Sequence, residues 1–97
     1  MMTPLMEACY RGYTAIAAEL LRLGAFVNAA DDQMTALVWA ADGGFVDTAR
    51  VLLAAPDVHV NARMSSGVTA LSIARRRGHA SVVQLLEAAG ARQYGQW

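Results

Sequence analysis

The stretch from Thr35 to Gly44 reads TALVWAADGG, and it decides the fold because the chain repeats it. A near copy, TALSIARRRGH, begins at Thr69, and an earlier relative, TPLMEACYRGY, begins at Thr3. The three threonines are 32 and 34 residues apart. Self-similarity at about 33 residues is typical of arrays in which short helical units stack side by side. One such unit cannot cover its own apolar face, so we interpret the repetition as the means by which this small chain builds a continuous core.

Each copy has the features of two helices joined by a turn. A threonine suited to cap a helix precedes an apolar-rich segment, and glycine follows that segment. We expect the first helices over residues 4–11, 36–42 and 70–77. We expect a second, longer helix in each unit, where apolar residues recur at helical spacing, over residues 14–23, 46–55 and 80–89. Polar connectors of hairpin-loop length lead from one unit to the next.

The composition limits the classes of function. The chain has 97 residues, 56% of them apolar, and a formal net charge of zero. These values favour a globular chain and argue against general attraction to nucleic acid or to an anionic membrane, so we expect neither as a partner. No uncharged stretch approaches the roughly 18 residues of a membrane span, and the first residues lack a secretory signal pattern. Because the single Cys9 also agrees with a reducing compartment, we expect a cytoplasmic protein.

The order of the repeated residues resembles the ankyrin repeat family. The family pattern runs Thr-Pro-Leu, Ala, Gly, a Leu-Leu pair, Gly-Ala and Asn-Ala. The first copy matches it through Thr3-Pro4-Leu5, Ala8, Gly12, Leu20-Leu21, Gly24-Ala25 and Asn28-Ala29. The later copies match through Thr35, Leu37, Ala40-Ala41, Gly44, Leu52-Leu53 and Asn61-Ala62, and through Gly67, Thr69, Leu71, Ala74, Gly78-His79, Leu85-Leu86 and Gly90-Ala91. The resemblance implies an all-α, ankyrin-type solenoid of three helix-turn-helix repeats joined by hairpin-like loops.

The same resemblance predicts the domain organisation. We expect a single domain over residues 1–92, with repeats at about 1–30, 31–63 and 64–92, and a C-terminal tail over residues 93–97. The connector from Asn28 to Thr35 is one residue shorter than that from Asn61 to Thr69, so its hairpin should be tighter. The middle unit has one extra residue near Pro56, which should leave a small bulge after its second helix.

No motif in the sequence indicates catalysis, a cofactor or a metal. His59 and His79 lie in different units, Cys9 is isolated from both, and the glycines are explained as helix stops or turns. The resemblance gives His79 a structural hydrogen-bonding role. We therefore expect no enzyme activity, no catalytic residue, no cofactor and no metal site.

The two ends of the array have different expectations. Arg75 occupies a position where Cys9 and Ala41 are small, so we interpret the third unit as the C-terminal cap. At the other end, Leu5, Ile16 and Leu20 are expected to be partly exposed on the N-terminal face. An exposed apolar patch of this kind is typical of a surface that another protein covers. This motivates an alternative to partner binding, in which the chain is a self-associating structural module, or a fragment of a longer array, and forms a homodimer through its N-terminal repeat.

The resemblance implies binding of a protein or peptide partner through the hairpin tips and the concave face of the first helices. Carried over position by position, that surface consists of Tyr10, Arg11, Asp32, Gln33, Met34, Asp42, Ser65, Ser66, Val68, Arg76 and Arg77. Because the middle unit is acidic and the last unit basic, we expect acidic partner groups toward the third repeat and basic ones toward the second. Successive residues of a helix point about 100° apart, so the arginines of residues 75–77 should not form one basic face. Tyr10 and Trp39 could pack between repeats or contact the partner.

Overall fold

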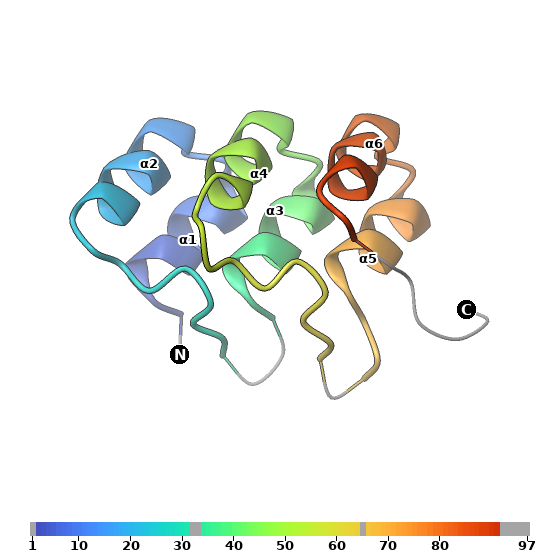
Figure 1. Ribbon diagram of the computed structural model, residues 1–97, viewed down its shortest axis with the longest axis horizontal. Helices are drawn as coiled ribbons and strands as arrows, with labels where there is room; N and C mark the ends of the chain where they lie inside the picture. The colour runs from blue at the N-terminus through green and yellow to red at the C-terminus, as the bar shows by residue number, and fades with distance from the viewer. Residues whose placement is uncertain (1, 32–33, 65, 92–97) are drawn as a thin grey trace.

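The computed structural model describes residues 2–31, 34–64 and 66–91. These residues form six helices and one isolated antiparallel bridge between Ala30 and Thr35. The helices are α1 (Pro4–Arg11), α2 (Thr14–Arg22), α3 (Ala36–Gly43), α4 (Val46–Leu53), α5 (Ala70–Arg77) and α6 (Ala80–Ala88). Figure 1 shows two rows, with α1, α3 and α5 side by side in one and α2, α4 and α6 in the other. The expected all-α solenoid of three helical pairs is confirmed.

Each first helix begins at the repeated threonine for the expected reason. The side-chain oxygens of Thr3, Thr35 and Thr69 accept a hydrogen bond from the backbone amide three residues later, at 3.1, 3.3 and 3.1 Å. At the third cap, Ser72 also accepts from the Thr69 amide at 2.9 Å, which completes a capping box. Each first helix ends at a left-handed glycine, and α1 and α5 have the predicted bounds.

The second helices are shorter than expected. Helix α4 has eight residues, as many as α3, so the prediction of a longer second helix is wrong for the middle unit. The residue before a proline is disfavoured in helical conformation, and Pro56 therefore restricts Ala55. The helix ends at Leu53, and turns carry the extra residue of the middle unit across residues 54–57.

The repeated leucine and alanine of each unit form the core. The exposed fractions of Leu5, Leu37 and Leu71 are 2%, 3% and 2%, and those of Ala8, Ala40 and Ala74 are equally small. The expectation that Leu5 is exposed on the N-terminal face is therefore wrong. Leu5 points into its own unit, where it lines a small cavity together with Leu20 and Ala25. Ile16, by contrast, is 53% exposed, and Leu20 is half-buried, both as predicted.

The leucine pair of the third unit is shifted by one position relative to the sequence match. Leu20, Leu52 and Leu86 each follow the residue that caps their second helix by seven positions. Leu52 and Leu86 are fully buried. Leu85 therefore corresponds to Glu19 and Val51, and the position of the second leucine holds Glu87, at the end of the stack.

Asparagines in the connectors join neighbouring units. Asn28 donates from Nδ2 to the carbonyl of Asp57 at 2.8 Å and accepts from the amide of His59 at 2.7 Å. Asn61 donates to the carbonyl of Gly90 at 3.2 Å. These bonds fix the position of each connector against the next unit, because they satisfy backbone groups that no helix uses.

The two hairpins differ as predicted. In the first connector, the amide of Asp31 donates to the carbonyl of Met34 at 3.1 Å. In the second, the amide of Met64 donates to the carbonyl of Val68 at 2.9 Å. The first turn is thus closed between residues three apart and the second between residues four apart.

None of the helices in the described ranges is both long enough and apolar enough for a membrane span.

Candidate protein-interaction surface

The side chains near the C-terminal ends of α1, α3 and α5 form the main candidate surface. Five predicted partner-binding residues lie there: Tyr10, Arg11, Asp42, Arg76 and Arg77. We call these residues, together with Trp39, the first-helix face. Helices α1, α3 and α5 lie side by side (Figure 1), so their Gly-capped ends bring three separate units together.

The predicted hairpin residues contribute less. Ser66 is exposed, whereas Met34 and Val68 are half-buried and pack against the core. Asp32, Gln33 and Ser65 lie outside the described residues. Met34 also donates from its amide to Oδ1 of Asp31 at 2.7 Å, so this part of the hairpin has a structural role.

An aromatic pair joins α1 and α3 on the first-helix face. The rings of Tyr10 and Trp39 meet edge to face, with centroids 5.1 Å apart and an angle of 79° between their planes. Trp39 is half-buried in this contact, while Tyr10 remains 49% exposed. The guanidinium carbon of Arg11 lies 6.0 Å from the centroid of the Tyr10 ring. Trp39 therefore packs between repeats, and Tyr10 both packs and presents half of its surface to solvent.

The indole nitrogen of Trp39 has no hydrogen-bond acceptor in the described part of the chain. Nε1 is buried and forms no hydrogen bond with any of the residues that the structure describes. A buried donor without an acceptor destabilises the fold by about 1–3 kcal/mol. The packing of the indole against Tyr10 must offset that loss.

The charges on the first-helix face are mostly paired within the chain. Arg77 donates from Nε to Oδ1 of Asp42 at 2.8 Å, which joins α5 to α3. Arg11 donates from Nε to Oε2 of Glu7 at 2.7 Å, and this hydrogen bond raises the pKa of Arg11. The carboxylate of Asp42 is thus already matched by an arginine of the third unit.

The three consecutive arginines point to different neighbours. Arg75 donates to Glu87 of α6 at 2.6 Å, on the end of the stack, and Arg77 reaches Asp42. Arg76 forms no ion pair with any described residue and is exposed. The prediction that residues 75–77 do not form one basic face is confirmed, and Arg76 gives the first-helix face a cation that pairs with none of the described residues.

The residues that could carry chemistry have structural roles. Nε2 of His79 lies 3.0 Å from the carbonyl oxygen of Asp42, so the tautomer protonated at Nε2 donates to it, as predicted. Cys9 is fully buried, and its burial raises the pKa of the thiol to about 12. Within residues 2–31, 34–64 and 66–91, no three His, Cys, Asp or Glu side chains are close enough to hold a metal ion.

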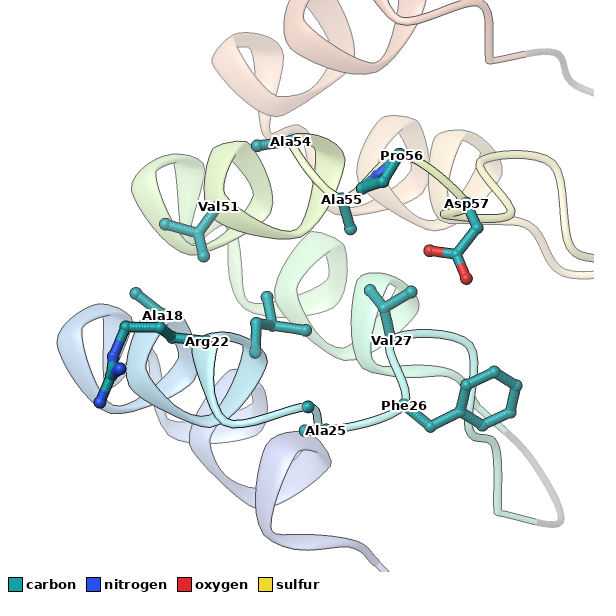
Figure 2. A pocket seen from close by; sticks show the side chains of 12 residues that line it. Ala18, Arg22, Ala25, Phe26, Val27, Val51, Ala54, Ala55, Pro56 and Asp57 are labelled. Atoms are coloured by element: carbon teal, nitrogen blue, oxygen red, sulfur yellow. The ribbon is translucent and has the colours of Figure 1, made fainter.

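A groove that the sequence did not reveal lies between the ends of α2 and α4. It has a volume of about 540 Å³ and is lined mainly by small apolar side chains, with Phe26 and Val27 on one wall and Ala55 and Pro56 on the other (Figure 2). The carboxylate of Asp57 lies at its edge (Figure 2). The extra residue near Pro56 was the available signal, because the connector that contains it forms one wall of the groove.

Stacked pairs of antiparallel helices with a shared core define a helical-repeat solenoid, a class of proteins that present one extended surface. A family model described as "Ankyrin repeats (3 copies)" matches residues 1–64. The chain belongs to the ankyrin repeat family.

Individual relatives agree with this assignment. The chain is 38% identical over 93 residues to "Ankyrin repeat and KH domain-containing protein mask-1" of Caenorhabditis elegans, covering 93% of this chain and 4% of that protein. It is 42% identical over 91 residues to "Ankyrin repeat and KH domain-containing protein 1" of Homo sapiens, covering 92% of this chain and 4% of that protein. Among solved structures, the human ASB11 ankyrin repeat domain matches with a TM-score of 0.90 and 31% identity, over 98% of this chain and 43% of that one. The chain thus spans only a small part of these curated relatives.

Proposed function

We propose that this chain is a non-catalytic module that binds a protein or peptide on its first-helix face. Ankyrin repeats generally mediate protein–protein interactions. The observation that supports a specific surface here is the half-exposed ring of Tyr10, held edge-on by Trp39 and flanked by charged groups. A rigid aromatic side chain that is already packed on one side loses little entropy on binding, and Tyr, Trp and Arg are the commonest anchors of interfaces.

The charge pattern favours an acidic group in the partner. Arg76 lies on the same face as Tyr10 and has no ion-pair partner among the described residues. A basic group opposite Asp42 has less support than the sequence suggested, because Arg77 already neutralises that carboxylate. We therefore infer a peptide or protein surface with an apolar group for Tyr10 and a carboxylate for Arg76.

A displayed library of peptides tests this function. Peptides selected on the wild-type chain should contain acidic and apolar residues, and should lose most of their binding to Tyr10→Ala and to Arg76→Glu. Arg50→Glu is the matched control, since Arg50 is an exposed arginine on α4, outside the first-helix face, whose ion-pair contact with Asp47 is long, at 3.5 Å. Selected peptides that bind Arg76→Glu as well as the wild type, or that lose binding to Arg50→Glu instead, would refute the proposed surface.

A further inference from the structure

A ring lies on a glycine wherever two units meet. A Cβ atom added to Gly12 would lie 2.8 Å from the ring of Phe45, and one added to Gly44 would lie 2.6 Å from the ring of His79. Phe45 and His79 are the residues that precede the second helices of their units. Each unit therefore places a ring on the helix-ending glycine of the unit before it.

The two ends of the described chain carry the unused halves of this contact. A Cβ added to Gly78, the equivalent glycine of the third unit, would meet no atom of the described residues within 4 Å. Tyr13 precedes the second helix of the first unit, as Phe45 and His79 do in theirs, and its ring is 49% exposed. Within the described ranges, one end thus has a glycine that no ring covers, and the other has a ring that covers no glycine.

The second helices repeat this relationship. Oγ1 of Thr48 lies 2.6 Å from Oγ1 of Thr14, and Thr48 is fully buried against α2. The equivalent of Thr48 is Val82 in α6, which is also fully buried, and Ile16 in α2, which is 53% exposed. The equivalent of Thr14 in the third unit is Ala80, which is exposed.

The end of the stack at α6 has room for such a side chain. Ala80 lies in a shallow groove of about 440 Å³, whose other lining residues are Arg75, Gly78, Val83, Gln84 and Glu87. This groove holds the glycine and the alanine that have no covering side chain among the described residues.

The charged residues at the two ends of the stack form a third pair of complementary positions. Trp39 contacts Tyr10 across the junction of the first two units. The position of Trp39, four residues after the capping threonine, is occupied by Glu7 in the first unit, and the position of Tyr10, seven residues after it, is occupied by Arg76 in the third. The two ends therefore carry opposite charges at positions that touch inside the stack, and Glu7, which also pairs with Arg11 at 2.7 Å, would share its carboxylate between the two arginines.

We propose that a second copy of this chain stacks head to tail on the first. Its Tyr13 lies on Gly78, its Ile16 on Ala80 and its Glu7 beside Arg76, as the corresponding residues do between units of one chain. The two faces of this contact are different, so it is heterologous and can extend into open-ended rows of molecules.

Arg75 limits the strength of the contact. Cys9 and Ala41, at the same position in the other units, are fully buried, whereas Arg75 is about half exposed and pairs with Glu87. Covering this end desolvates that ion pair, which opposes association. We therefore expect weak self-association that Arg75→Ala strengthens by roughly tenfold or more.

Sedimentation velocity over a concentration series tests the stack with the full chain. Ile16→Glu blocks the end of the stack at α2, which we call the head, and Ala80→Glu blocks the end at α6, which we call the tail. Each variant alone should be monomeric. An equimolar mixture of the two variants should form dimers and nothing larger. The intact head of Ala80→Glu can bind the intact tail of Ile16→Glu, and both outer ends of that dimer are blocked. Ala15→Glu is the matched control, since Ala15 is the exposed neighbour of Ile16 and should leave association unchanged.

Each outcome of these sedimentation measurements either supports or overturns the proposed stack. A wild-type chain that remains monomeric, or an Arg75→Ala variant that associates no more tightly than wild type, overturns the proposal. Ala80→Glu that associates as the wild type does would indicate contact between two N-terminal faces, and would also overturn it. Neither blocking position lies on the first-helix face, although the stack itself uses Arg76. Partner binding is therefore measured on the monomeric Ile16→Glu variant, where it succeeds or fails whether or not the wild-type chain stacks.

Discussion

Nε of Arg77 lies 2.8 Å from Oδ1 of Asp42, although the two residues belong to different units. Both were predicted to contact a partner, and the structure shows that they contact each other. Arg76, the adjacent residue, forms no ion pair with any of the described residues. The two arginines should therefore respond differently to the same substitution.

Arg77→Glu should destabilise the fold by about 1 kcal/mol, because it places a carboxylate beside Asp42 in a partly exposed pair. Arg76→Glu should change the free energy of unfolding by less than about 0.5 kcal/mol, as an exposed site without a partner does. Urea unfolding of both variants measures the difference. Equal losses in the two variants would show that the Arg77–Asp42 pair contributes nothing.

Trp39→Phe should leave the free energy of unfolding within about 1 kcal/mol of the wild type. The substitution removes the buried Nε1 donor that has no acceptor among the described residues, and it keeps an aromatic ring against Tyr10. Trp39→Ala removes the ring as well and should cost about 3 kcal/mol. If chemical denaturation gave the same loss for both, an aromatic ring against Tyr10 would contribute nothing to the free energy of unfolding.

Gly44→Ala should be more damaging than Gly78→Ala. Both glycines end a first helix in the left-handed conformation, with φ of +72° and +76°, so both substitutions carry a strain of about 1 kcal/mol. Only at Gly44 does the added Cβ also meet the ring of His79, at 2.6 Å. We expect an additional loss of about 1–3 kcal/mol at Gly44.

A double-mutant cycle with His79→Ala isolates that contact. The extra loss should disappear when Gly44→Ala is measured in the His79→Ala background, because the ring that obstructs the new Cβ is then absent. Thermal or urea unfolding of the four proteins gives the coupling. Additive losses would exclude the ring as the cause.

Alkaline pH should weaken the fold through Cys9. Burial raises the pKa of this thiol from 9.0 to about 12 in the folded chain, so between these values the unfolded chain loses the proton and the folded chain keeps it. The stability linked to Cys9 is complete below pH 9 and falls as the pH rises toward 12. Cys9→Ala, which places at this position the residue that Ala41 supplies in the second unit, should lose stability less steeply over the same range. Parallel pH profiles of the two proteins would contradict this.

The sequence predicted the fold well because the features that determine it are local. The capping threonines, the helix-ending glycines and the spacing of leucine and alanine all act within one unit, so they can be read without knowing how units pack. The register of Leu85 and Leu86 was misjudged because a Leu-Leu pair can be matched at either of two positions, and only burial in the stack distinguishes them.

The candidate site was predicted only in outline. The residues at the ends of the first helices were identified correctly as neighbours, because each unit repeats the same geometry. Their pairing was not, since the Arg77–Asp42 bond and the Tyr10–Trp39 contact depend on side-chain directions between units that are far apart in the sequence. Pairing of that kind follows from packing, which no single motif encodes.

Amide and indole chemical shifts, recorded as a selected acidic peptide is added to the labelled chain, test the central claim most directly. The resonance of Trp39 Nε1–H, assigned with the Trp39→Phe variant, and the amides around Tyr10 and Arg76 should shift most and saturate together. The helices of the other row, α2, α4 and α6, should shift little. If the largest shifts fell instead on α2 and α4, the first-helix face would not be the binding surface.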